Sequence, residues 1–127
     1  MVDICPLNHD GNLIDASALA AMLALQEARF PAFDGQTVDY KTKTDKKLPL
    51  SKFPIAVTVL KIGDHFIVDP TKEEESYADA RITVTSTEDG KLCSLQKNGT
   101  KGVSIKEVDA MLSLGLKKAA EIRKVIQ

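Results

Sequence analysis

The stretch Phe53–Asp69, FPIAVTVLKIGDHFIVD, decides the fold. Two apolar, β-branched runs flank Gly63 and Asp64, and a glycine-containing connection between such runs is typical of a β-hairpin. A second hairpin is predicted in residues 80–97, where ARITVTST and KLCSLQK flank the turn residues Glu88–Gly90. These apolar runs are long enough for central strands of a sheet.

Two helices are predicted to pack on these strands. The first has Asp15 as its N-cap, continues through an alanine-rich run and ends before Pro31. It carries almost no charge before Glu27, so we expect it to be buried on more than one side. The second opens with the capping box Ser104–Glu107 and continues to the C-terminus. Its apolar stripe consists of Val108, Met111, Leu112, Ala119, Ile122 and Val125.

The other segments are less regular. Val2–Leu7 is predicted to form a strand, and a strand so close to the start suggests the second half of something longer. Residues 34–52 are predicted to form a long, mobile surface loop with a short strand at Thr37–Tyr40. Taken together, the pattern predicts one α+β domain spanning residues 1–127, a mixed β-sheet with two hairpins packed by at least two helices.

Composition narrows the classes of function. The chain has 127 residues, of which 43% are apolar and 28% charged, and this is typical of one globular domain. A net charge of −1 gives no overall positive field to attract nucleic acid. Cys5 and Cys93 lack metal-ligand spacing and are expected to be buried thiols in a reducing, intracellular setting. The sequence shows neither a signal peptide nor a membrane span, so we expect a soluble protein without a membrane partner.

The strongest candidate site is Val68–Arg81, VDPTKEEESYADAR. Its carboxylates could converge on Mg²⁺ or act as general acid and base, although solvated surface charge is the simpler explanation. The spacing does not match an EF-hand, since the segment contains no glycine. Arg81 would compete with a metal for the carboxylates. The segment is therefore predicted to be an ion-pair network, and its carboxylates are Asp69, Glu73, Glu74, Glu75 and Asp79.

Three further features are weaker candidates. His9 and His65 have no Ser or Cys in a nucleophile context, so each is predicted to be a surface or packing histidine. Asn98–Gly102, NGTKG, resembles a phosphate-binding loop but lacks its glycine spacing, and a turn before a capped helix is favoured. The cations of residues 117–124 could contact RNA phosphates or complement the helix dipole.

Four segments together resemble the second half of the RNase PH family, over essentially the whole chain. They are LNHDGNLIDASALAAMLAL, FPIAVTVLKIGDHFIVDPTKEEE, DARITVTSTEDGKLCSLQK and the capped C-terminal helix. Within that family, DGN followed by DAS and the phrase VDPTKEEE are most similar to exosome ring subunits that do not catalyse, particularly the archaeal type.

The resemblance also bears on the acidic segment. In active family members, two aspartates here serve phosphorolysis of RNA with magnesium present, and their positions correspond to Glu75 and Arg81. Arginine can neither bind a metal nor give up its proton at working pH. The resemblance therefore implies a degenerate site at Glu75, Asp79 and Arg81, with no catalytic residue and no cofactor. Asp69 and Asp79 are expected to pair with Arg81.

The resemblance implies a non-catalytic structural subunit of a six-membered exosome ring, which supports 3′-to-5′ RNA degradation by a catalytic RNase PH-type partner. This hetero-oligomer would bind RNA through the assembled ring, in the cytoplasm of an archaeon or in the nucleus and cytoplasm of a eukaryote. Two alternatives stay open. One is an active phosphate-dependent exoribonuclease that uses Glu75 and Asp79, and the other is a free-standing α+β binding domain. The RNA-binding residues stay unknown, including whether Lys41, Lys43, Lys46 and Lys47 contact RNA.

Overall fold

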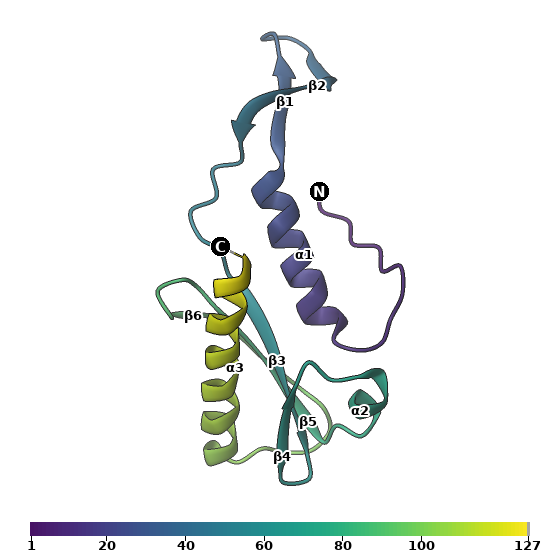
Figure 1. Ribbon diagram of the computed structural model, residues 1–127, viewed down its shortest axis with the longest axis vertical. Helices are drawn as coiled ribbons and strands as arrows, with labels where there is room; N and C mark the ends of the chain where they lie inside the picture. The colour runs from purple at the N-terminus through teal and green to yellow at the C-terminus, as the bar shows by residue number, and fades with distance from the viewer. Residues whose placement is uncertain (127) are drawn as a thin grey trace.

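The computed structural model describes residues 1–126 and contains two antiparallel sheets and three helices in that range (Figure 1). Strands β3 to β6 form a four-stranded sheet in the order β4-β3-β5-β6, and β1 and β2 form a separate two-stranded sheet. The elements are α1 (Leu13–Glu27), β1 (Arg29–Phe33), β2 (Val38–Lys47), β3 (Ile55–Ile62), β4 (His65–Val68), α2 (Lys72–Ser76), β5 (Ala80–Ser86), β6 (Leu92–Asn98) and α3 (Ile105–Ile126).

The predicted α+β class, its two hairpins and its packed helices are confirmed. One detail differs, because each strand pairing in residues 1–126 is antiparallel, whereas we expected a mixed sheet. The reason is local. Tight turns join β3 to β4 and β5 to β6, and only antiparallel neighbours can be joined so briefly. Gly63 at φ 57° and Gly90 at φ 74° supply the left-handed backbone that the two turns need.

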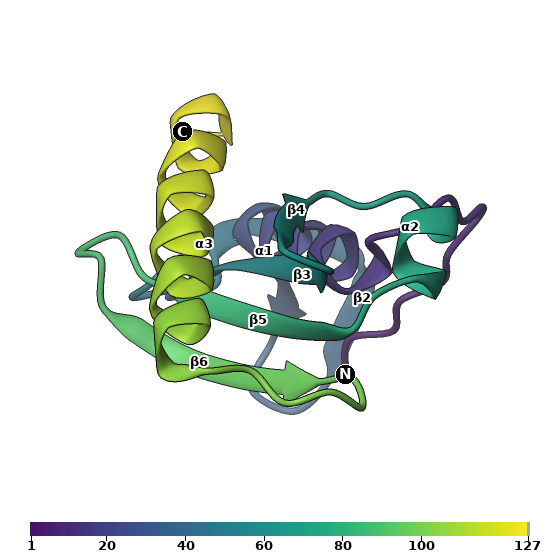
Figure 2. The ribbon, with the colours of Figure 1, turned by 90° about the horizontal axis from the view of Figure 1, so that it is seen from below.

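The core lies between the four-stranded sheet and α3 (Figures 1 and 2). Val57, Val59 and Val84 point to this helix and are buried together with Met111 and Ala119. The helix approaches the sheet closely at Gly115, where an added Cβ would lie 2.3 Å from Val84 Cγ1. The capping box that opens α3 is confirmed: Ser104 N–H donates to Glu107 Oε2 at 2.6 Å, and Glu107 N–H donates to Ser104 Oγ at 3.3 Å. Val125 departs from the expected stripe, since it is 85% exposed near the helix end.

The N-terminal prediction is wrong. Val2–Leu7 is an exposed segment without regular structure, since none of the described strands pairs with it. Helix α1 starts at Leu13, with Asn12 rather than Asp15 as its N-cap, because the Asp15 carboxylate is engaged by the sheet instead. Both cysteines are exposed, contrary to the expected burial. Cys5 lies in this same exposed segment, and Cys93 lies on the edge strand β6.

Helix α1 is less buried than predicted. It packs on β3 along one side, on the face opposite α3, and none of its described residues is fully buried. Ile14 and Leu23 are both exposed, although they lie nine positions apart and therefore on opposite sides of the helix. A helix covered by one strand alone cannot bury two faces, so its alanine-rich composition is not explained by packing within the described residues.

Residues 34–52 contain a long strand rather than a loop. Strand β2 spans Val38–Lys47 and pairs with β1, in which Pro31 lies. The prediction failed because both faces of this hairpin are largely exposed, so no apolar alternation marks the strand. The hairpin projects from the end of α1, away from the four-stranded sheet (Figure 1). Within residues 1–126 no helix is long and apolar enough to cross a membrane.

Candidate functional site

The acidic segment forms a short helix and a pair of turns at one end of the four-stranded sheet. Thr71 caps α2 through a capping box: its N–H donates to Glu74 Oε2 at 2.8 Å, and Glu74 N–H donates to Thr71 Oγ1 at 3.3 Å. We predicted only a connecting loop here. The Thr-x-x-Glu spacing of residues 71–74 is a helix-start signal that would have identified this helix.

The segment is bound to the loop that precedes α1. Asn12 N–H donates to Glu75 Oε1 at 3.1 Å, and Asn12 Nδ2 donates to Asp69 Oδ1 at 2.9 Å. Both Asn12 and Asp69 have left-handed backbones, at φ 52° and 54°. The carboxylates of Asp69 and Glu75 therefore hold the acidic segment against the loop before α1, and Oε1 of Glu75 accepts a hydrogen bond from a backbone amide.

The same junction leaves no room for a side chain at Gly11. Lys72 N–H donates to the carbonyl of Asp10 at 2.9 Å, which presses the two backbones together. A Cβ at Gly11 would lie 2.1 Å from the carbonyl oxygen of Pro70, and its φ is 110°. Only glycine fits this close approach.

The predicted pairing of Arg81 with Asp69 and Asp79 is wrong. Asp79 instead pairs with Lys101, Oδ1 to Nζ at 2.7 Å, and accepts a hydrogen bond from Gly63 N–H at 3.0 Å. The Lys101 hydrogen bond, followed by the one from Gly63, lowers the pKa of Asp79. Arg81 lies half-buried in β5, opposite Leu60 and Asn98, and forms no ion pair with a carboxylate of residues 1–126. The turn that carries Lys101 folds back onto Asp79, and Lys101 N–H donates to the Asp79 carbonyl at 3.2 Å.

This donor set does not fit a divalent cation. A magnesium ion needs carboxylate oxygens that converge, but Asp79 is held by an ammonium group and Glu75 by a backbone amide. No group of three or more potential metal ligands gathers anywhere in the described chain, residues 1–126. Arg81 adds a positive charge to the same segment.

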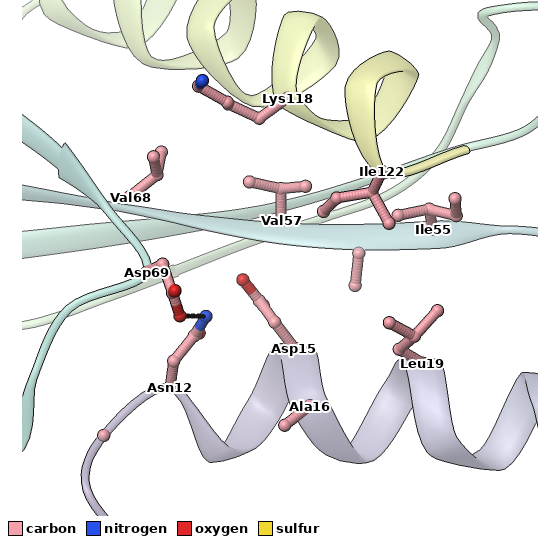
Figure 3. Close-up of a pocket in the computed structure, with 12 residues that line it drawn as sticks. Asn12, Asp15, Ala16, Leu19, Ile55, Val57, Val68, Asp69, Lys118 and Ile122 are labelled. Carbon is pink, nitrogen blue, oxygen red and sulfur yellow. Dashed lines mark hydrogen bonds between the residues drawn. The ribbon is translucent and has the colours of Figure 1, made fainter. Parts of the chain in front are cut away.

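A groove of about 440 Å³ opens beside the site, between α1, β3 and α3 (Figure 3). It exists because β4 pairs only with Val59–Ile62 of β3, so the first half of β3 has an open edge. Asp15 lies on the α1 wall and Lys118 on the α3 wall. Most of the remaining lining is aliphatic, including Leu19, Val57 and Ile122.

Asp15, which we predicted to be a helix N-cap, instead lines the groove and binds the sheet. Its carboxylate accepts hydrogen bonds from Thr58 N–H and from Thr58 Oγ1, both at 2.7 Å, and Thr58 Oγ1 contacts Thr83 Oγ1 at 2.8 Å. Burial raises the pKa of Asp15, although the bonds from Thr58 oppose the shift. The carboxylate thus takes the place of a neighbouring strand at the open edge of β3.

The weaker candidates have structural roles. His9 Nδ1 accepts a hydrogen bond from Gly11 N–H at 3.2 Å, and His65 is exposed at the start of β4, as expected for surface histidines. The NGTKG segment is the predicted turn: Lys97 Nζ donates to the carbonyls of Gly99 and Lys101 at 2.9 and 2.7 Å. Among the C-terminal cations of α3, Lys118 pairs with Glu121 at 2.6 Å, and Arg123 donates to the carbonyls of Phe53 and Ser86 at 2.7 and 3.0 Å.

Comparison with known proteins identifies the class. Residues 52–118 match the family model described as 3′ exoribonuclease family, domain 2, which is the C-terminal domain of RNase PH. The chain belongs to this family, as its sequence resemblance indicated. The matched residues contain β3 to β6 and most of α3, together with the whole acidic segment.

Similar individual proteins include components of archaeal exosomes. The chain is 40% identical to exosome complex component Rrp42 of Thermococcus onnurineus over 98% of its own length, and 41% identical to that of Pyrococcus furiosus. It spans about half the length of the curated relatives it matches, 47% and 46% in these two. A chain of the Archaeoglobus fulgidus exosome with RNA bound to the active site superimposes with a TM-score of 0.82 at 35% identity, covering 95% of this chain and 46% of that one. A chain of an archaeal exosome core gives 0.80 at 36%, with coverages of 93% and 46%.

Proposed function

We propose that this chain is a single domain, residues 1–127, which acts as the C-terminal half of a non-catalytic RNase PH-type subunit in an archaeal exosome ring. It supports 3′-to-5′ RNA degradation by a catalytic partner subunit, in the cytoplasm, without turnover of its own. The relatives named as exosome components support the assembly part of this proposal. The residues of the acidic segment support its non-catalytic part.

The observation that carries the proposal is which residues occupy the two positions that are catalytic in active family members. One holds Glu75, whose carboxylate accepts a backbone hydrogen bond from Asn12. The other holds Arg81, a permanent cation where phosphorolysis needs a carboxylate. Asp79, the nearest replacement, is paired with Lys101. Glu75, Asp79 and Arg81 are therefore proposed to be remnants of a catalytic site kept for structure.

The active-enzyme alternative is less well supported by this geometry. A rearranged pair would need Glu75 and Asp79 to converge, but each carboxylate is bound to a different part of the chain. The free-standing binding domain is also less well supported, since the relatives that cover nearly this whole chain are named as components of a complex.

Native mass spectrometry tests the assembly. The chain is mixed with a catalytic RNase PH-type exosome subunit, and we expect discrete hetero-oligomers in which the two subunits are equal in number. A chain that stays monomeric at every ratio would contradict the proposal.

A phosphorolysis assay tests the absence of turnover. The chain alone, supplied with RNA, inorganic phosphate and Mg²⁺, is expected to release no nucleoside diphosphate. Release that is abolished by Glu75→Gln, but not by Glu73→Gln, would support the active enzyme instead. Glu73 is a suitable control because it is exposed and belongs to the same short helix.

A further inference from the structure

The β1–β2 hairpin is a large feature that the proposed function does not use. We call residues Arg29–Lys47 the hairpin arm. Each of its residues is exposed or half-buried, and its two strands join no other sheet. It projects from the end of α1, well away from the four-stranded sheet (Figure 1). An isolated two-stranded hairpin is only marginally stable in water, so we expect contacts with a partner to stabilise the arm.

The three carboxylates of the arm bind groups within the arm. Asp34 Oδ1 accepts hydrogen bonds from the backbone of Gln36 and Thr37 at 2.8 and 2.7 Å. Asp39 accepts one from Lys41 N–H at 2.9 Å, and Asp45 pairs with Arg29 at 3.4 Å. These acids fix turns and strand ends and keep their negative charge, but the five cations of the arm outnumber its three carboxylates by two.

Three lysines of the arm are left without an acidic partner. Lys41, Lys43 and Lys46 form no ion pair with any carboxylate of residues 1–126, whereas Lys47 pairs with Glu27 at 3.0 Å. Lys46 lies over the ring of Phe30, 5.4 Å from its centroid. Within a chain of net charge −1, the arm is thus a locally positive surface.

The same arm also carries exposed aromatic side chains. The register shifts between Pro31, which pairs with Lys43, and Ala32, which pairs with Asp39, so residues 40–42 form a bulge on β2. A bulge turns side chains out of the ladder. Tyr40 is 82% exposed at the bulge, and Phe33 is 64% exposed at the turn end of β1.

We propose that the hairpin arm binds single-stranded RNA, with Lys41 and Lys43 on phosphates and Tyr40 stacked on a base. Cations interleaved with exposed aromatics are the pattern by which proteins hold single strands, since every base has a face to stack and every linkage a charge. A protein partner would have to place acidic groups opposite these lysines to offset their desolvation, whereas a single strand of RNA carries a phosphate at every linkage. This inference rests on the proposed function, in which RNA passes through the assembly.

Fluorescence anisotropy tests the arm. The full chain, alone and mixed with the catalytic subunit, is titrated against a fluorescein-labelled single-stranded oligoadenylate at several salt concentrations. For Lys41→Ala/Lys43→Ala we expect weaker binding and a log–log salt slope reduced by about 1.4, because each lost phosphate contact removes about 0.7 from the slope for a single strand. Tyr40→Ala should weaken binding about fivefold or more, and Tyr40→Phe should not.

The matched control is Lys117→Ala/Lys124→Ala, which removes the same charge from exposed positions of α3. Its binding curve should coincide with that of the wild type. Equal losses of RNA affinity in the two double variants would show that only general electrostatics is at work, and this would overturn the inference. The absence of RNA binding by the wild type would also overturn it. Arm variants that lose the catalytic subunit instead of RNA would also overturn it, in favour of a protein contact. If the unaltered chain never associates with the catalytic subunit, it is the proposed function that fails.

Discussion

Carboxylates in two regions of the molecule, α1 with the acidic segment and the hairpin arm, make hydrogen bonds of opposite range. In the first region they bind groups that are distant in sequence: Glu75 binds Asn12, and Asp15 binds Thr58. In the arm, Asp34 and Asp39 bind amides two or three residues away. Long-range bonds hold elements together, whereas local bonds only shape turns.

The difference separates what is structural from what is available for binding. A carboxylate oxygen that accepts a hydrogen bond from a distant amide is less available to a metal or for proton transfer, and breaking that bond would loosen the fold. In the arm, Lys41, Lys43 and Lys46 form no ion pair with a carboxylate of residues 1–126, so they are available to an external partner. The acidic segment, which looked most like chemistry in the sequence, is therefore the part that we expect to matter for stability. The arm is expected to matter for binding.

The largest expected contrast comes from truncating one apolar side chain in each region. Met111→Ala empties a fully buried position between α3 and the sheet, so the free energy of unfolding should fall by about 2–5 kcal/mol. Phe33→Ala removes a side chain that is 64% exposed in the arm and should change it by less than about 0.5 kcal/mol. Urea unfolding followed by circular dichroism measures both. Equal losses would mean that the arm is packed as tightly as the core.

A pair of glycine substitutions sharpens the contrast. Gly11→Ala and Gly35→Ala both place a side chain on a left-handed backbone, at φ 110° and 99°, which costs about 1–2 kcal/mol. At Gly11 the new Cβ also meets the backbone of Pro70, whereas nothing lies within 4 Å of it at Gly35. Gly11→Ala should therefore destabilise the protein by about 1–3 kcal/mol more than Gly35→Ala, in the same unfolding experiment. A smaller effect at Gly11 would contradict the close contact of the two backbones.

A pair of aspartates tests long-range against local hydrogen bonds. Asp15→Ala leaves the N–H of Thr58, a residue that is 3% exposed, without its acceptor, so stability should fall by about 1–3 kcal/mol. Asp39→Ala frees an exposed amide that water can satisfy, and its effect should lie within about 0.5 kcal/mol. Asp15→Asn keeps one acceptor oxygen and should lose less than Asp15→Ala. If the Asn and Ala variants lose equally, the bond to Thr58 does not stabilise the fold.

Sequence patterns predicted the features that depend on neighbours along the chain. The turn at Gly63 and the capping box at Ser104 each lie within a few residues, and both are confirmed. The capping box at Thr71 carried the same kind of signal and was overlooked. Strand β2 had no such signal, because a strand exposed on both faces has no reason to alternate.

The partners within the candidate site could not be predicted in this way. The Glu75–Asn12 and Asp15–Thr58 bonds link residues 63 and 43 positions apart, and no periodicity encodes such contacts. Arg81 was expected to pair with Asp69 and with Asp79, which is only two positions away. The folded turn brings Lys101 to Asp79 instead, so proximity along the chain was the wrong guide.

The smallest expected effect is a difference in acid sensitivity. Hydrogen bonds from Ser104, together with Lys61, lower the pKa of Glu107 from 4.5 to about 2. A carboxylate with a lowered pKa in the folded state stabilises the protein above its unfolded pKa, and this contribution is lost as the pH falls from 4.5 towards 2. Glu107→Gln should therefore lower stability slightly at pH 7 and flatten the decline below pH 4.5. The Lys61–Glu107 ion pair, at 3.1 Å, joins β3 to α3, so global unfolding reports on it.

The matching carboxylate in the arm is Asp34, whose pKa is also lowered, by backbone hydrogen bonds from Thr37 and Gln36. These bonds lie within the arm, so Asp34→Asn should leave the global profile unchanged while loosening the arm, as amide hydrogen exchange would detect. A global profile altered equally by both variants would show that the arm unfolds together with the core.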